Sequence, residues 1–269
     1  MLLPHLLQAL NVMRNLSDSQ TMRLYLTIFS MFFCLSQVTA QCDWYNISVY
    51  PKTRQISKNP IIVIEGLASG IDVIFALQNN NSLYFKSDNS KIKLKIREVC
   101  VGQVMVAQIV LLPETTLTPG TEYTLVTDNL PYGENLNRWD SLEQKIGPIK
   151  YLVRNSAVPA MSKMVSTPIK IENHVSPTSC GINEYVTFDY KLSDSSQYFF
   201  KAKVKNIKTG RTVSYYIWSY GSKISIGHSS CGGPFDYEKN GLYQLQLLPL
   251  DEFGNFCTPT NPINFRSPS

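Results

Sequence analysis

The side chains of this chain that could do chemistry are two histidines, several cysteines and an aromatic run. His174 and His228 are the histidines that follow the N-terminal 40 residues, and His228 stands beside Ser229, Ser230 and Cys231. A nucleophile would need a base and an orienting acid, but no Gly-x-Ser-x-Gly, His-Glu-x-x-His or phosphate-loop pattern occurs. A loop histidine near a disulfide explains His228 more simply. The sequence therefore predicts no catalytic residue, no cofactor and no enzyme.

The aromatic run comprises Tyr215, Tyr216, Trp218 and Tyr220. In a strand, Tyr216, Trp218 and Tyr220 share one face, while Tyr215 and its neighbour Ile217 share the other. Such a ladder can stack on sugar rings or contact a protein partner. A core face with a buried tryptophan is the interpretation that the sequence favours. Tyr216, Trp218 and Tyr220 are the one binding surface that the sequence suggests.

Metal ligands are not predicted. No Cys-x-x-Cys or His-rich spacing accompanies the cysteines. The segment Asp251–Asn255 offers carboxylate and amide oxygens, but it lacks the alternating acidic positions of an EF-hand. Turns commonly use Asp, Gly and Asn, so a turn is expected there.

An apolar stretch near the N-terminus predicts export. Leu24–Phe33 follows the basic Met22-Arg23, and Val38–Ala40 places small residues before a cut. This pattern is typical of a signal peptide cleaved after Ala40, so residues 1–40 are removed and Gln41 begins the mature chain. Residues 1–21 are interpreted as an upstream extension, with Met22 as the true start. A retained signal anchor is the alternative, but the stretch is short for a span of about 20 residues, so no integral membrane span is expected after cleavage.

The charge of the mature chain limits which classes of partner it can bind, and its length limits the number of domains. Removing Arg14, Arg23 and Asp18 lowers the formal charge from +5 to +4. Lysines are interleaved with acidic residues, so there is no cluster of basic residues of the kind that binds nucleic acid, and a nucleic-acid partner is not expected. The 229 residues after Ala40 are enough for two domains of about 100 residues each.

Strands dominate the pattern after Cys42. Ile61–Ile64 and Ile71–Leu77 are apolar runs of strand length, and Ile92–Arg97 alternates strictly. Turn residues separate the runs, which together predict an all-β fold. The other expected strands are Val104–Leu112, Tyr185–Tyr190, Phe199–Val204 and Val213–Tyr220.

A sequence pattern that occurs twice divides the chain into two modules. Thr118–Leu125 and Glu238–Leu245 each place a glycine in a turn and a tyrosine two or three residues later. In immunoglobulin-like sandwiches a tyrosine hydroxyl at this corner bonds to upstream backbone. The repeated pattern predicts two tandem immunoglobulin-like β-sandwich domains, residues 42–155 and 165–269, joined by a linker at 156–164.

The same segments carry a resemblance. Thr118-Pro119-Gly120-Thr121-Glu122-Tyr123-Thr124-Leu125 resembles a segment of bacterial immunoglobulin-like domains of the S-layer type. Gly241-Leu242-Tyr243 followed by Asp251–Asn255 is similar to the end of bacterial immunoglobulin-like and fibronectin-like modules. The resemblance covers about 20 residues per domain. It implies an extracellular or envelope location and a structural or adhesive role.

Five cysteines remain after export, and an oxidising compartment favours disulfides. Strand order in a sandwich puts Cys42 and Cys100 at one pole of the first domain, and Cys180 and Cys231 at one pole of the second. These two pairs are the expected bridges. Cys257 is then the odd thiol, free or bonded to another chain as a disulfide-linked dimer, with Cys231–Cys257 as the rival pairing.

Together these observations predict that the chain is a non-enzymatic, exported interaction or structural module of the cell envelope or extracellular space. Its expected partner is a protein or a cell-surface glycan. One alternative is a carbohydrate-binding module that uses exposed aromatic side chains around Trp218. The other is an accessory part of a secreted hydrolase system, which a polar cleft of converging acids and histidines would favour.

Overall fold

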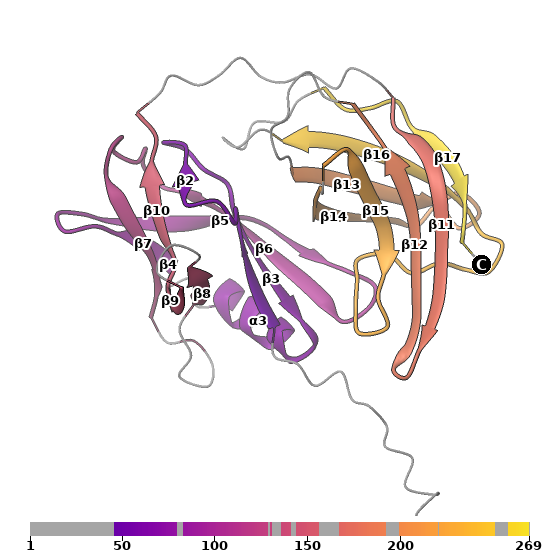
Figure 1. Cartoon of the computed structure of the whole chain (residues 1–269), viewed down its shortest axis with the longest axis horizontal. Helices are drawn as coiled ribbons and strands as arrows, with labels where there is room; N and C mark the ends of the chain where they lie inside the picture. The colour runs from indigo at the N-terminus through magenta and orange to yellow at the C-terminus, as the bar shows by residue number, and fades with distance from the viewer. Residues whose placement is uncertain are drawn as a thin grey trace, which may run out of the picture. The chain divides into compact units, whose positions relative to one another are not determined.

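The computed structural model describes residues 46–79, 83–128, 130, 136–140, 144–155, 167–191, 199–219, 221–250 and 258–268 (Figure 1). Gln41–Ser269 forms one compact unit, and strands make up most of it. The expected leader at 1–40, the linker at 156–164, Cys42, Cys257, Tyr220 and Asp251–Asn255 lie outside the described residues. Within the described residues no helix has the length and hydrophobicity to span a membrane.

The first module contains ten strands and one α-helix among the described residues. One eight-stranded sheet has the order β1-β3-β6-β5-β4-β7-β10-β2, and β8 and β9 form a separate pair. The elements are β1 (Asn46–Tyr50), β2 (Gln55–Ile56), β3 (Ile62–Leu67), the 3-10 turn η1 (Ala68–Gly70), α3 (Ile71–Asn79), β4 (Leu83–Lys86), β5 (Lys91–Val101), β6 (Val106–Pro113), β7 (Glu122–Thr127), β8 (Asn137–Asp140), β9 (Lys145–Pro148) and β10 (Lys150–Val153).

The long strand β5 joins two groups of strands into this sheet. Its first residues, Lys91–Lys93, pair with β4, and the rest of the strand pairs with β6. The pairing with β6 shifts register between Ile96 and Glu98, and such a bulge bends a strand. One group is therefore β1-β3-β6, and the other is β5-β4-β7-β10-β2.

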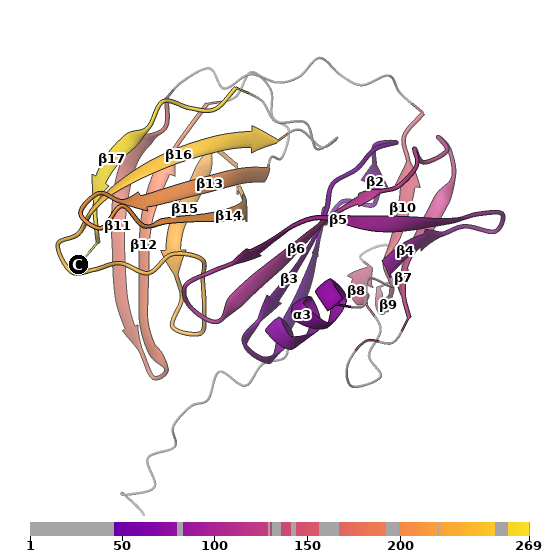
Figure 2. The ribbon, with the colours of Figure 1, turned by 180° about the vertical axis from the view of Figure 1, so that it is seen from behind.

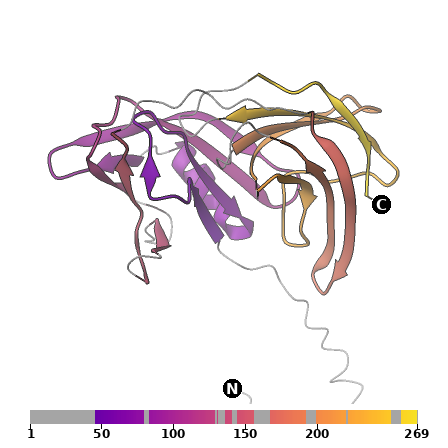
Figure 3. The same ribbon diagram turned by 45° about the horizontal axis from the view of Figure 1, so that its top comes forward.

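The second module has two separate sheets. Three strands follow the order β11-β12-β15, and four follow the order β14-β13-β16-β17. The β11–β12 hairpin is the long salmon pair in Figure 3. The strands are β11 (Ile169–Thr178), β12 (Gly181–Asp189), β13 (Phe199–Asn206), β14 (Thr212–Trp218), β15 (Lys223–His228), β16 (Leu242–Leu250) and β17 (Ile263–Arg266).

The two modules repeat one strand order. In sequence order, β1, β3, β4, β5, β6, β7 and β10 occupy the sheet positions of β11, β12, β13, β14, β15, β16 and β17. The first module differs in four ways among the described residues: β5 connects its two groups of strands, β2 adds to the edge beside β10, α3 lies between the second and third strands of the repeat, and the β8–β9 pair lies between the last two.

Both expected tyrosine corners are confirmed. The Tyr123 hydroxyl accepts a hydrogen bond from the Thr118 amide at 3.2 Å, and the Tyr243 hydroxyl accepts one from the Glu238 amide at 2.6 Å. Each bond reaches back five residues. The residue three positions before each tyrosine has a positive φ: 75° at Gly120 and 56° at Asn240, a conformation that glycine and asparagine tolerate best.

The prediction of a strand at Ile71–Leu77 is wrong, because this segment is the helix α3. Its buried residues Val73, Ile74 and Leu77 lie on one helical face, which packs against β3 and β6 (Figure 2). Gly66 makes the close approach possible, since a Cβ at this position would lie 2.2 Å from the carbonyl oxygen of Gly70. Tertiary packing thus overrides the strand preference of the β-branched residues.

The described residues form two hydrophobic cores, and one of them includes residues of both modules. The strand pair β3 and β6 contributes Ile62, Ile64 and Ile109 to a core within the first module. The alternate residues Val63 and Val110 belong to a core shared with the second module, whose side is rich in aromatic residues. The group β1-β3-β6 is therefore covered on both faces.

Neither expected disulfide is present. Cys100 and Cys180 are free thiols, whereas Cys231 is disulfide-bonded, so the pair Cys180–Cys231 does not form. The two residues do lie at the same end of the second module, as expected. However, Cys180 is in the β11–β12 turn, which extends past the end of β15, and the chain turns back sharply at Ser229–Gly232.

The pairing of Cys42 with Cys100 fails for a different reason. Cys100 is near the end of β5, while Cys42 precedes β1, and the sheet places β3 and β6 between these two strands. Three strand spacings, about 14 Å, separate β1 from β5, which is more than the roughly 7 Å limit between the Cα atoms of a disulfide. The start of β1 and the end of β5 do lie at one pole, because Asn46 pairs with Leu67, Leu67 with Val106, and Ala107 with Val101. The expectation left out the order of the strands across the sheet, and Cys42 itself lies outside the described residues.

Candidate functional site

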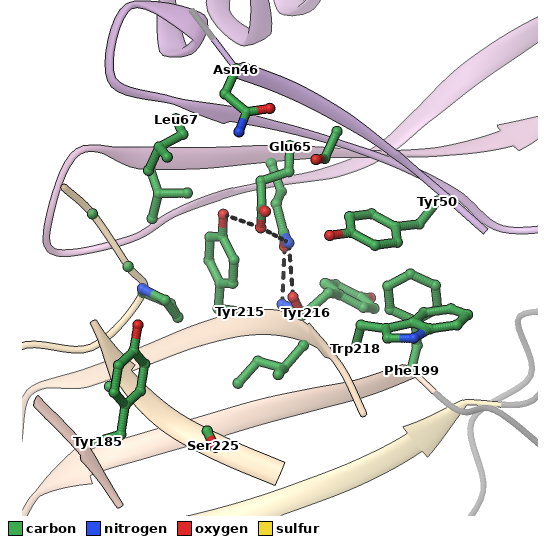
Figure 4. A pocket seen from close by; sticks show the side chains of 18 of the residues that line it. Asn46, Tyr50, Glu65, Leu67, Tyr185, Phe199, Tyr215, Tyr216, Trp218 and Ser225 are labelled. Atoms are coloured by element: carbon green, nitrogen blue, oxygen red, sulfur yellow. Dashed lines mark hydrogen bonds between the residues drawn. The ribbon is translucent and has the colours of Figure 1, made fainter. Parts of the chain in front are cut away.

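A cavity of about 590 Å³ lies where the two modules meet (Figure 4). The strands β1, β3 and β6 supply one wall, and β12, β14 and β15 supply much of the other. The lining side chains that carry its chemistry are Tyr50, Glu65, Gln108, Tyr215, Tyr216 and Trp218.

The strand β14 is the outermost of its sheet, so one edge of its backbone has no neighbouring strand. Gln108 makes hydrogen bonds to that edge. Its side-chain Nε2 donates to the Tyr216 carbonyl at 2.8 Å, and its Oε1 accepts from the Tyr216 amide at 3.0 Å. The amide of one side chain thus replaces a neighbouring strand. Gln108 is 1% exposed, so these are bonds between buried groups, which are costly to leave unmade.

Glu65 is a buried carboxylate at the centre of the cavity wall. Tyr215 donates its hydroxyl proton to Oε2 at 3.0 Å, and Gln108 Nε2 donates to the same oxygen at 2.8 Å (Figure 4). Burial raises the pKa of this carboxyl, and these two bonds with the charge of Lys52 offset part of the rise. The same burial, with the nearby Glu65, raises the pKa of Tyr215 well above its usual value, so the phenol remains a donor.

Glu98 of β5 forms a second polar contact between the modules. It accepts hydrogen bonds from the Tyr216 hydroxyl and from the Lys201 ammonium group of β13. Burial alone would raise the pKa of Glu98, but the bonds and the charge of Lys201 outweigh it and lower the pKa. This carboxylate is therefore ionised and anchors two side chains of the second module.

Aromatic rings form one side of the cavity. Trp218 stacks on Tyr50 with ring centroids 5.7 Å apart, and meets Phe199 edge to face at 4.5 Å. Tyr50 and Phe199 also touch, at 5.4 Å. Trp218 is half-buried, so its ring retains a surface that a ligand in the cavity can contact.

The structure brings together two of the three aromatic residues that the sequence suggested. Tyr216 and Trp218 both line the cavity, and Tyr220 lies outside the described residues. Both faces of the strand carry aromatic residues, so at least one tyrosine of the run is expected to be partly exposed. Tyr215 and Tyr216 are each 1% exposed, because the first module covers the edge strand that carries them. The expectation therefore rests on Tyr220 and stays a prediction.

The sequence analysis did not identify the polar residues that connect the two modules, Glu65, Gln108 and Glu98. Glu65 and Gln108 interrupt the apolar runs 61–67 and 104–112, and an isolated polar residue in a buried strand is the signal that could have identified them. Glu98 follows the alternating stretch Ile92–Arg97, where it resembled a surface charge. Its role depends on a contact with a module more than 100 residues away.

The two histidines occupy unrelated positions. His174, on β11, is exposed and has Nε2 3.1 Å from the Ser176 hydroxyl. His228 ends β15, outside the cavity lining, near Glu184 and Asp236. Among the described residues, these last three form the one group of potential metal ligands, with ligand atoms within 4.8 Å of one another.

Comparisons with known proteins give distant likenesses. No protein-family model and no curated protein matches the chain. Solved structures that match include a type I pullulanase from Bacillus subtilis complexed with maltose, with 7% identity and a TM-score of 0.25; the match covers 81% of this chain and 24% of that one. A pullulanase from Anoxybacillus sp. matches with 12% identity and a TM-score of 0.22, over 78% of this chain and 24% of that one. The S-layer protein rSbsC matches with 11% identity and a TM-score of 0.24, over 76% of this chain and 32% of that one. The chain spans a third or less of each, and TM-scores this low assign it neither fold nor function.

Proposed function

We propose that this chain is an exported, non-enzymatic interaction protein of two immunoglobulin-like modules, which binds a neutral glycan in the cavity between them. The shared strand order and the two tyrosine corners support the immunoglobulin-like assignment. The apolar stretch before Ala40 supports export to the cell envelope or beyond.

The cavity is the observation that carries this proposal. Its volume of about 590 Å³ lies within the usual range of small-ligand sites, about 300–1,000 Å³. Tyr50, Phe199 and Trp218 provide ring surface against which the C–H faces of a sugar can pack. Asn46 and Glu65 provide side-chain oxygens and an amide that sugar hydroxyls can bond.

The charge of the lining favours a neutral ligand. Glu65 and Glu172 are the acidic side chains of the lining, and Lys223 is its basic side chain. An ionised Glu65 would repel an anionic ligand, and a protonated Glu65 would offer it no opposite charge. A polyhydroxylated uncharged ligand avoids this cost.

Titration of the tag-free mature protein with neutral oligosaccharides of glucose, galactose, mannose and N-acetylglucosamine tests this function. We expect one of these sugars to change tryptophan fluorescence saturably. Trp218→Ala should reduce its affinity at least about tenfold, because aromatic anchors dominate such contacts. Tyr84→Ala is the matched control, since the Tyr84 hydroxyl bonds to the exposed Asp128 and lies outside the lining.

Two results would overturn the glycan proposal. One is the absence of saturable binding to any of these sugars, and the other is equal affinity of Trp218→Ala and wild type. In either case the contacts at Glu65, Gln108 and Glu98 would serve rigid joining of the modules alone.

A further inference from the structure

We propose that Glu184, His228 and Asp236 form a binding site for a divalent metal ion of the zinc class, separate from the cavity. One ligand atom of each residue lies within 4.8 Å of the others, although the residues span more than 50 positions of sequence. The sequence predicted no metal, because no spacing pattern connects these three residues.

Three elements converge at this site. Glu184 in β12 and His228 in β15 are directly opposite each other in the antiparallel register, so their side chains share one face. Asp236 follows β15 on the way to β16. The first module holds this connection, since Gly233 pairs with Val104 and the Asp236 amide donates to Gln103 Oε1 at 3.2 Å.

The carboxylate of Glu184 is available for coordination. Glu184 is 8% exposed, and no hydrogen bond or ion pair connects its carboxylate to any described residue. Its oxygens are not among the described buried atoms that lack a partner, so they remain accessible to a metal ion. A cation held between Glu184, His228 and Asp236 would pair with two carboxylates at once.

The imidazole of His228 is oriented for coordination. Its Nδ1 lies 2.9 Å from the Ser229 carbonyl oxygen, to which an Nδ1–H group donates. That tautomer leaves the lone pair of Nε2 on the side of Asp236, whose Oδ1 is 3.5 Å away. A backbone bond of this kind is the usual outer-shell partner of a metal-bound histidine.

The donor set selects the class of metal. One imidazole nitrogen with two carboxylate oxygens matches the ligands of Zn²⁺, which accepts nitrogen and oxygen donors and can complete its shell with water. Ca²⁺ and Mg²⁺ prefer shells made of oxygen alone. The site is therefore assigned to Zn²⁺ over the hard cations.

Isothermal titration of the tag-free mature protein with Zn²⁺, after removal of bound metal by a chelator, tests the site, with Ca²⁺ as a comparison. We expect one Zn²⁺ per chain and much weaker Ca²⁺ binding. His228→Ala and Glu184→Gln should each weaken Zn²⁺ binding by more than the about 10- to 100-fold that loss of an outer-shell partner costs. His174→Ala is the control, because that histidine is exposed on β11 and pairs with Tyr185, so its side chain is on the face of the sheet opposite to that of Glu184.

Each variant is first checked for native circular dichroism. If Glu184→Gln fails to fold, Asp236→Asn replaces it, since the Asp236 side chain is 57% exposed and tolerates substitution. The proposal is overturned if wild type binds no Zn²⁺, if His228→Ala binds as tightly as wild type, or if His174→Ala loses binding to the same extent. In the first case the contact between His228 Nε2 and Asp236 Oδ1 would account for the cluster.

Discussion

At the scale of single residues, Glu65 makes the stability of the protein depend on pH. Its pKa is raised in the folded state by burial, so the folded protein retains a proton that the unfolded chain has released. The unfolded state then binds fewer protons, and stability falls as pH rises from about 4.5 through the folded pKa. Below this window both states are protonated and the penalty disappears.

The substitution Glu65→Gln should remove this penalty. The glutamine oxygen can still accept the bonds from Tyr215 and Gln108, but it carries no charge. Denaturant unfolding at pH 4.5 to 8 should therefore show the variant gaining stability relative to wild type as pH rises. The exposed Glu114 provides the control substitution, Glu114→Gln. A stability difference for Glu65→Gln that does not vary with pH would contradict the assignment.

The tyrosine corners permit a second residue-level prediction. Tyr243→Phe and Tyr123→Phe each leave a backbone amide, that of Glu238 or Thr118, without its acceptor. We expect each to lower the free energy of unfolding by about 1–2 kcal/mol. Urea denaturation measures this loss, and Tyr84→Phe, whose hydroxyl bonds to an exposed carboxylate, should cost less than about 1 kcal/mol. Equal losses in all three variants would show that the corners add no special stability.

At the scale of elements, the edge of β14 depends on one side chain. Gln108→Ala removes both bonds to the backbone of Tyr216 and one donor to Glu65. We expect a loss of about 2–3 kcal/mol, because buried polar groups become unsatisfied. Hydrogen exchange at the Tyr216 amide should accelerate well beyond what the overall loss of stability explains.

Gln103→Ala is the control for this element-level prediction. Its side-chain oxygen also accepts one backbone amide, that of Asp236, but at an exposed position. This variant should lose less than about 1 kcal/mol and keep wild-type exchange at Tyr216. If Gln108→Ala left that exchange unchanged, the edge of β14 would be protected by some other contact.

The elements also show what sequence reasoning could and could not reach. The strands and the corners follow from period and turn chemistry, which act locally. The helix α3 was missed because Ile71, Val73 and Ile74 favour strands in isolation, while packing against β3 and β6 decides the outcome. The apolar runs 61–64 and 104–112, the second interrupted by Gln108, did contain a further signal. An alternating strand has one buried face, and a continuous run indicates two.

At the scale of the whole molecule, the cysteines have distinct accessibilities. We expect alkylation of the native protein to label Cys180, which lies in an exposed turn, and to spare Cys100 until unfolding. Burial and the nearby charge of Glu98 raise the pKa of Cys100 to about 12, which suppresses its thiolate. Non-reducing peptide mapping should find Cys231 bonded to Cys257, the rival pairing. A native protein in which Cys100 reacts as fast as Cys180 would contradict this order.

The candidate site could be inferred only in part from the sequence, for a reason that belongs to this scale. Tyr216 and Trp218 were found because aromatic clustering is visible along the chain. Their partners Glu65 and Gln108 belong to another module, and nothing in local sequence specifies which face of one module meets the other. The first module also hides residues of the second that would be exposed in an isolated sandwich, as Tyr215 and Tyr216 show.

Because one core includes residues of both modules, the two modules should unfold as one unit. Val63 and Val110 of the first module belong to the same core as Phe200 and Tyr215 of the second, and exposing one set exposes the other. Scanning calorimetry of the mature wild-type protein should give a ratio of calorimetric to van't Hoff enthalpy of about 1.

The polar contacts of Glu98 and Gln108 with the second module are expected to maintain this coupling. In the double variant Glu98→Ala/Gln108→Ala the hydroxyl of Tyr216, the ammonium group of Lys201 and the edge of β14 lose their partners in the first module. The enthalpy ratio should then rise clearly above 1 as the modules begin to unfold separately. Glu122→Ala, which removes exposed ion pairs to Arg54 and Lys150 within the first module, should leave the ratio unchanged. Two transitions in the wild-type protein would mean that the shared core is too weak to couple the modules, and a single transition in the double variant would assign the coupling to apolar contacts alone.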